Sequence, residues 1–155
     1  MVKVRDRYKA AIEYLERYKE ATKDVDRAKA EYDEEMEQID NIRSALGGDG
    51  MPRSGEINRK VEADAIRLED KARELIEAEV AALEIRQDIV QTINKVGGSA
   101  ADVLMEKYVK LDENGRLKTW RAVAAAVGYS VDNVYTLRRK GLEAVEKILV
   151  SKTLQ

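Results

Sequence analysis

The stretch TWRAVAAAVGYSVDNVYTLRRKGLEAVEKIL, residues 119–149, predicts two helices joined by a tight turn. Thr119 is placed to cap a first helix that runs through Val127, and Ser130 is placed to cap a second helix. Between them, Gly128 can adopt the positive φ that a tight interhelical turn requires. This punctuation is typical of a helix-turn-helix.

The apolar spacing in this stretch fits the same motif. Val123 and Val127 lie four residues apart on one face of the first helix, and Ala124 is small where the two helices would cross. Val134 and Leu137 lie three apart on the second helix and would point into the same core. We expect that buried face to continue through Leu142, Val145, Ile148 and Leu149.

The outward face of the second helix then carries side chains that can read DNA. Asn can pair with adenine and Arg with guanine, while Thr can contact a thymine methyl group. The run Arg138-Arg139-Lys140 is suited to neutralising phosphates, as are Lys118 and Arg121 near the first helix. The predicted DNA-binding residues are Arg121, Ser130, Asp132, Asn133, Tyr135, Thr136, Arg138, Arg139 and Lys140.

Two sequence patterns resemble known transcription proteins. GYSVDNVYTLRRKGLEAVEKI, residues 128–148, resembles the C-terminal helix-turn-helix of sigma factor region four. ADVLMEKYV, TWRAVAAAVGYS and NVYTLRRKGLEAV together resemble the phage-encoded ArpU-type transcriptional regulators of Gram-positive bacteria. The resemblance covers the last third of the chain and implies a helical region followed by a sigma-like helix-turn-helix. It is carried by Tyr108, Trp120, Val123, Gly128, Tyr129, Ser130 and Val134.

A further short helix is expected before this motif. Gly97 and Gly98 interrupt the chain, and Ser99 followed by Asp102 resembles a capping box for a helix over residues 100–110. The stretch Asp112-Glu113-Asn114-Gly115 reads as a turn. It lacks the remaining ligand positions of a calcium loop, so we predict no calcium site there.

Residues 1–96 predict a long helical hairpin. Segments of about Val4–Leu46 and Glu56–Val96 place apolar residues at gaps of three and four, which is the spacing of a coiled coil. The connecting residues 47–55 contain four Gly and the only Pro, and they indicate a loop. The first seam comprises Val4, Tyr8, Ala11, Leu15, Tyr18, Val25, Tyr32, Met36, Ile39 and Leu46, flanked by Ile12, Ala28 and Ile42. The second comprises Val61, Ala65, Leu68, Ala72, Leu75, Ala82, Ile89, Ile93 and Val96, flanked by Ile76, Val80, Leu83 and Val90.

Such a hairpin buries only one seam on each arm, and each seam Ala contributes little buried area. We therefore expect self-association, with a dimer favoured, or packing of the hairpin against the C-terminal domain. The sequence leaves open whether the arms pair within one chain or exchange between two chains.

Composition narrows the chemistry. The chain has neither Cys nor His, which removes thiol nucleophiles, the usual hydrolase triads and the commonest metal ligands. We predict no enzyme, no catalytic residues, no cofactor and no metal site. The opening MVKVRDRYKA has no apolar signal core, and no stretch has the length of a membrane span, so we expect a cytoplasmic protein.

Charge is distributed unevenly along the chain. Residues 1–98 carry 18 Lys and Arg against 23 Asp and Glu, whereas residues 99–155 carry 10 Lys and Arg against 7 Asp and Glu. The basic end is the better candidate for a polyanionic partner.

The sequence thus predicts an all-α fold: an antiparallel coiled-coil hairpin over residues 1–96, then a small three-helix domain with the helix-turn-helix over residues 99–155. The leading functional prediction is a transcriptional regulator, phage or prophage encoded, that binds double-stranded DNA in a bacterial host. Its hairpin would mediate oligomerisation or contact with a partner such as RNA polymerase. Two alternatives stay open: a coiled-coil adaptor for a protein partner, and a DNA-packaging protein like a small terminase subunit.

Overall fold

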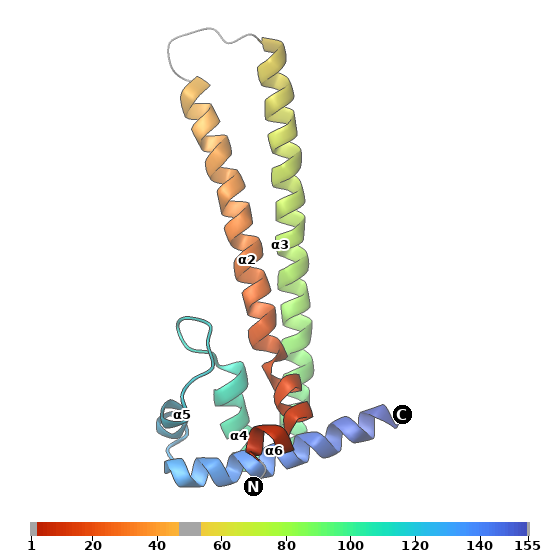
Figure 1. Ribbon diagram of the computed structural model, residues 1–155, viewed down its shortest axis with the longest axis vertical. Helices are drawn as coiled ribbons and strands as arrows, with labels where there is room; N and C mark the ends of the chain where they lie inside the picture. Colours follow the sequence, from red (N-terminus) through yellow and green to blue (C-terminus); the bar gives the residue numbers. More distant parts are fainter. Residues whose placement is uncertain (1–2, 47–53, 155) are drawn as a thin grey trace. The chain divides into compact units, whose positions relative to one another are not determined.

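The computed structural model describes residues 3–46 and 54–154, and all of the regular structure in these ranges is helical. Helices α2 and α3 form a long antiparallel hairpin, and the smaller helices that follow pack together, as predicted (Figure 1). No helix in these ranges is both long enough and apolar enough to cross a membrane. The elements are α1 (Val4–Arg7), α2 (Lys9–Leu46), α3 (Ser54–Val96), α4 (Gly98–Leu104), the π-helical turn η1 (Met105–Val109), α5 (Trp120–Val127) and α6 (Val131–Thr153).

The first arm differs from the single helix that was predicted. The buried Tyr8 has φ −115° and ψ 35°, which separates the short α1 from α2. The predicted loop begins at residue 47, and residues 47–53 lie outside the described ranges. Ser54 and Gly55, assigned to that loop from the sequence, already belong to α3.

The chain divides into two compact units. Among the described residues, the first, here called the core unit, consists of residues 3–22 and 82–154, and the second, the hairpin unit, consists of residues 23–46 and 54–81. The sequence-based division placed residues 1–96 in one domain. In the structure, residues 3–22 share a compact unit with residues 82–154. A division based on Gly and loop composition follows the order of the chain, whereas this unit joins segments that are distant along it.

The core unit is held together by a cluster to which almost every one of its helices contributes. Leu15 of α2, Ile93 of α3, Leu104 of α4 and Leu142 of α6 are all fully buried in this cluster. Helix α6 crosses α2 and α3 where α2 begins and α3 ends, which brings these side chains together (Figure 1). The other buried members are Tyr8, Ala11, Ile12, Ile89, Ala101, Tyr108, Val109 and Val145.

The helix predicted over residues 100–110 is present with a different start and end. It begins at Gly98, follows Gly97 at the N-cap position, and has no side-chain cap. The predicted capping box of Ser99 and Asp102 is therefore wrong, because Ser99 lies inside the first turn. Its hydroxyl is instead 3.0 Å from the hydroxyl of Tyr129, in the turn between α5 and α6.

The predicted turn after that helix is confirmed. The Asp112 carboxylate accepts hydrogen bonds from the backbone N–H groups of Asn114 and Arg116, at 2.8 and 2.9 Å. Gly115 has φ +72°, a conformation that other residues rarely adopt. Asp112 therefore closes the turn through its own side chain.

The hairpin unit buries its seam only partly. Seam residues such as Val25, Met36 and Leu68 are half-buried, and none of the unit's described apolar side chains is fully buried. Val61, predicted to lie on the seam, is 46% exposed. The arms are also linked by an ion pair of 3.2 Å between Lys71 of α3 and Glu31 of α2.

Candidate nucleic-acid interface

The two caps and the turn of the helix-turn-helix are formed as predicted. The Thr119 hydroxyl accepts a hydrogen bond from the N–H of Ala122, and the Ser130 hydroxyl accepts one from the N–H of Asn133, each at 3.2 Å. Gly128 ends α5 with φ +77°, a left-handed conformation. These features set the start of α6 one short turn after the end of α5.

A small core fixes the two helices against α4. Val123 and Ala124 of α5, Val134 of α6 and Val103 of α4 are buried together, with Val127 and Leu137 packed against them. The predicted inward residues of α5 and α6 are thereby confirmed. Leu142 and Val145 belong to the other cluster, with α2 and α3, so the buried face of α6 serves two cores in succession.

The opposite side of α6 presents a row of polar side chains. Asp132, Asn133, Arg139 and Lys140 are exposed, and Thr136 is half-buried. Their spacing of three, four and seven residues places them on one side of the helix. The Thr136 hydroxyl donates to the backbone oxygen of Asp132 at 3.2 Å. We call these five residues the α6 polar row.

The remaining predicted contact residues have different surroundings. Arg121 is exposed near the start of α5. Ser130 is exposed, but its hydroxyl is used by the cap. Arg138 and Tyr135 both lie against Trp120: the Arg138 guanidinium is 4.6 Å from the ring centre, and the Tyr135 ring centre is 5.9 Å away. Of the predicted Arg138-Arg139-Lys140 run, Arg139 and Lys140 are exposed and Arg138 is half-buried.

Trp120 is held between two cations. The Lys107 ammonium lies 4.5 Å from the ring centre, in addition to the Arg138 guanidinium. Burial, together with the nearby Arg138 charge, lowers the pKa of Lys107. Because a cation over an aromatic face is attracted to it, this arrangement joins η1, α5 and α6. Sequence reasoning missed this role, since a lone Trp does not identify the cations that will contact it.

Lys118 was predicted to contact phosphate, and the structure gives it another role. Its ammonium lies 2.7 Å from Glu106, which also pairs with Lys110 at 2.9 Å. Burial alone would raise the pKa of Glu106, but the hydrogen bonds from the two lysines outweigh it and lower that pKa. Lys118 therefore anchors the segment before α5 to η1.

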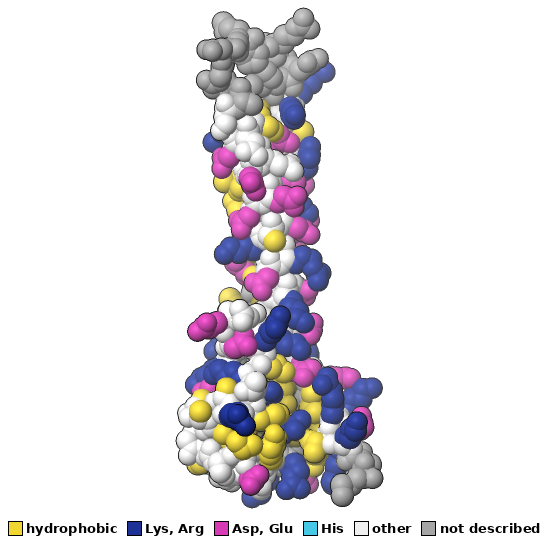
Figure 2. Space-filling view, turned by 60° about the vertical axis from the view of Figure 1, so that its left-hand side comes forward, with side chains coloured by type: hydrophobic (Ala, Val, Ile, Leu, Met, Phe, Trp, Pro, Cys, Tyr) yellow, Lys and Arg dark blue, Asp and Glu magenta, His cyan; other side chains and the backbone are white. Residues whose placement is uncertain are grey.

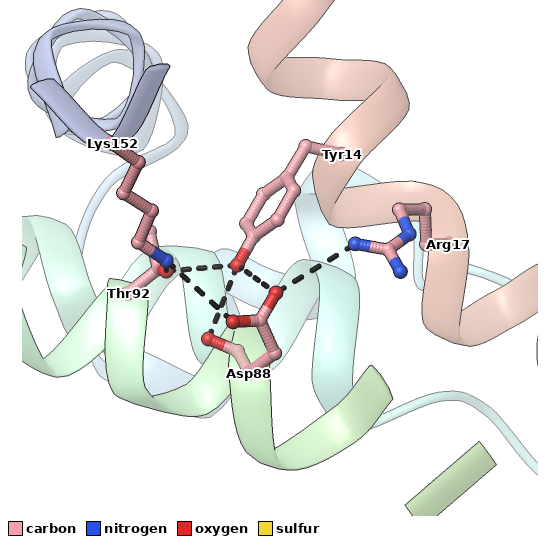
Figure 3. Close-up of polar contacts among 5 residues, drawn as sticks. All are labelled: Tyr14, Arg17, Asp88, Thr92 and Lys152. Carbon is pink, nitrogen blue, oxygen red and sulfur yellow. Dashed lines mark hydrogen bonds and ion pairs between the residues drawn. The ribbon is translucent and has the colours of Figure 1, made fainter. Parts of the chain in front are cut away.

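Within the core unit, a polar cluster links the C-terminal part of α6 to α2 and α3 (Figure 3). The Tyr14 hydroxyl lies 2.7 Å from the Asp88 carboxylate and 2.8 Å from the Thr92 hydroxyl. Lys152 of α6 donates to Thr92 at 3.1 Å and pairs with Asp88 at 3.5 Å, while Arg17 pairs with Asp88 at 3.6 Å. Burial, reinforced by Asp88, raises the pKa of Tyr14 to about 12. The cluster helps to fix the direction of α6.

The surface of the core unit is rich in positive charge. On the face shown in Figure 2, Lys and Arg side chains (dark blue) border an apolar area (yellow) of this unit.

Among residues 3–46 and 54–154, no group of three or more acidic, His or Cys side chains is arranged to hold a metal ion. The candidate site in the core unit is the polar and basic side of α5 and α6. Comparison with family models, curated proteins and solved structures gives no match for this chain.

Proposed function

We propose that this chain is a DNA-binding transcriptional regulator whose recognition helix is α6. In this proposal the start of α6 enters the major groove, and Asp132, Asn133 and Thr136 of the α6 polar row face the base edges. Arg139 and Lys140, with Arg121 from α5, contact the flanking phosphates. The protein acts without catalysis on double-stranded DNA in the cytoplasm of a bacterial host, as a phage-derived member of the sigma-like class that its sequence resembles.

One observation carries this proposal: the geometry of α5 and α6. Two capped helices meet at a left-handed Gly and bury Val123, Ala124 and Val134 on the inner side. The same arrangement leaves Asn133, Arg139 and Lys140 exposed on the other side of α6. Asn is suited to an adenine edge, and the cationic side chains are suited to phosphates.

The hairpin unit supports a second element of the proposal, self-association. Val61, Ile66, Ile76 and Val80 of α3 are between 46% and 61% exposed. Burying such side chains is favourable, and a second copy of the same hairpin offers matching apolar surface. A dimer would also bring two copies of α6 to one DNA, which raises the affinity that a single short row can supply.

Selection from a random double-stranded DNA pool at low salt tests the DNA-binding element. We expect the wild-type chain to enrich a defined sequence. An Arg139→Gln/Lys140→Gln variant should bind that sequence with a salt slope shallower by about 2, since each lost phosphate contact removes about one counterion. A matched control, Arg73→Gln/Arg86→Gln, removes two exposed cations from α3 and should leave binding unchanged. A wild-type chain that retains no DNA at low salt overturns the proposal.

Light scattering of the same sample distinguishes the alternatives. A dimer that binds DNA supports the regulator. A ring-sized oligomer that binds DNA favours a packaging protein like a small terminase subunit. A chain that captures a protein such as RNA polymerase and ignores DNA favours a coiled-coil adaptor, for which the exposed apolar side chains of α3 would form the docking surface.

A further inference from the structure

The short helix α1 lies beside the proposed recognition helix. Val4 of α1 lines one pocket with Asp132, Thr136 and Arg139 of α6. Arg5, the next residue, lines a neighbouring pocket together with Arg138 and Trp120, among others. All of these residues belong to the core unit. The opening of the described chain therefore flanks the α6 polar row.

Packing fixes this position. Tyr8, which separates α1 from α2, is buried in the main cluster, and Val4 packs against the same cluster. The backbone N–H of Ala11, in the next turn, donates to the Glu146 carboxylate of α6 at 3.1 Å. Residues on both sides of Tyr8 are therefore anchored. As a result α1 is held against α6, although Ala11 and Glu146 are 135 positions apart in the chain.

Around α1 lie three cations, Lys3, Arg5 and Arg7, which we call the basic turn, and all three are exposed. The Arg5 side chain is 76% exposed, and its ion pair with Glu16 is long, at 3.8 Å. Arg7 lies over the Tyr8 ring at 5.5 Å, a contact that leaves a guanidinium able to bind phosphate. The acidic neighbours of the turn are Asp6 on the same helix, Glu13 and Glu16 of α2, and Asp132 across the pocket.

The start of α6 supplies little positive charge of its own. It begins with Val131 and Asp132, and Arg138 is engaged with Trp120. A helix that enters the major groove needs cations beside it, because phosphate contacts provide much of the affinity and set the orientation of the helix. The basic turn supplies exposed cations beside the pocket that Val4 shares with Arg139.

We propose that the basic turn is a second DNA-contacting element, which binds the phosphate backbone along one wall of the groove that receives α6. This inference rests on the proposed function. It makes the DNA-binding surface composite: the base-reading side chains come from α6, and part of the phosphate contact comes from α1.

The test compares three variants in one salt-titrated binding assay on the selected DNA. Arg5→Gln/Arg7→Gln should make the slope of log K against log salt shallower by about 2 and lower the affinity roughly 10-fold at moderate salt. Its thermal midpoint should match that of the wild type, since both side chains are exposed. Arg139→Gln/Lys140→Gln should reduce the slope similarly, and Arg73→Gln/Arg86→Gln should leave it unchanged.

The outcomes separate the two proposals. If Arg139→Gln/Lys140→Gln weakens binding while Arg5→Gln/Arg7→Gln keeps the wild-type slope, the basic turn does not contact DNA and only this inference is overturned. Tighter binding by Arg5→Gln/Arg7→Gln also overturns it, because α1 would then obstruct the α6 polar row. If the wild-type chain itself ignores DNA, the proposed function and the inference are overturned together.

Discussion

Helices α2 and α3 run through both compact units, and they are buried to very different extents in the two. In the core unit they contribute Leu15, Ile89 and Ile93, which are fully buried beneath α4 and α6. In the hairpin unit the same coiled-coil spacing leaves half-buried seam residues, and Ile76 is 59% exposed. Two paired helices can cover only one side of each other, so full burial requires a third layer. The difference shows that an apolar seam becomes a core only when another element covers it.

The largest expected effect comes from truncating the shared core. Leu15→Ala removes a fully buried side chain from the centre of the core unit and should lower the free energy of unfolding by about 3 kcal/mol. Ile66→Ala, at a site 61% exposed in the hairpin unit, should change it by no more than about 0.5 kcal/mol when both variants are measured at a concentration low enough to keep the chain monomeric. Urea denaturation followed by circular dichroism measures both. Equal losses for the two variants would contradict the contrast between the units.

A smaller effect is expected at the cation-flanked Trp120. Trp120→Leu removes the ring on which Lys107 and Arg138 rest, and it should lower the free energy of unfolding by about 1–2 kcal/mol. Trp120→Phe keeps an aromatic face and should lose less. Circular dichroism is the appropriate signal, because Trp120 is the only Trp in the chain and both variants lose Trp fluorescence. An Arg138→Gln variant that loses stability but keeps the salt slope of DNA binding would support the assignment of Arg138 to packing.

The cap of α6 allows stability and DNA binding to be separated. Ser130→Ala removes the hydrogen bond to Asn133 and should destabilise the protein by about 1 kcal/mol. Ser130→Asp keeps a good cap and should retain most of the stability. It also places a carboxylate at the start of the recognition helix, so it should weaken DNA binding by phosphate repulsion. A stable Ser130→Asp variant that binds DNA as tightly as the wild type would place the DNA elsewhere.

The smallest effect at neutral pH is expected at Tyr14. Burial raises the pKa of Tyr14 in the folded protein to about 12, above the ordinary value of 10.0 for a tyrosine, so the folded state favours the protonated hydroxyl. The stabilisation is complete below pH 10 and is lost as pH rises through about 12. The free energy of unfolding should therefore fall more steeply with rising alkaline pH for the wild type than for Tyr14→Phe. An equal pH dependence in the two proteins would show that the ionisation of Tyr14 is not linked to folding.

Several features were predictable because they depend on residues close together in the chain. The caps at Thr119 and Ser130, the left-handed Gly128 and the turn closed by Asp112 all form within a few residues. The capping box of Ser99 failed although it is also local. The helix begins at Gly98, before the predicted start, with Gly97 at the N-cap position. The Ser99 hydroxyl forms a hydrogen bond with Tyr129, which lies 30 residues away in the chain.

The candidate site was predictable only in part. The exposed positions of Asn133, Arg139 and Lys140 follow from the burial of Val134 and Leu137 three residues apart. Nothing in the local pattern distinguishes Arg138 from Arg139, because both belong to one basic run. The difference arises from Trp120, because the Arg138 guanidinium lies over its ring.

The sequence by itself determined that the chain is helical, where most helices begin and end, and which faces are apolar, since these depend on hydrogen bonds and spacing within a few turns. Only the tertiary structure decided which seam residues are fully buried and which cations are free. It also decided that α1 and the first turn of α2 flank α6, through contacts such as the one between Ala11 of α2 and Glu146, 135 residues apart. The physical reason is that burial and charge pairing depend on neighbours in space, and a helical pattern repeats alike whether or not another helix covers it.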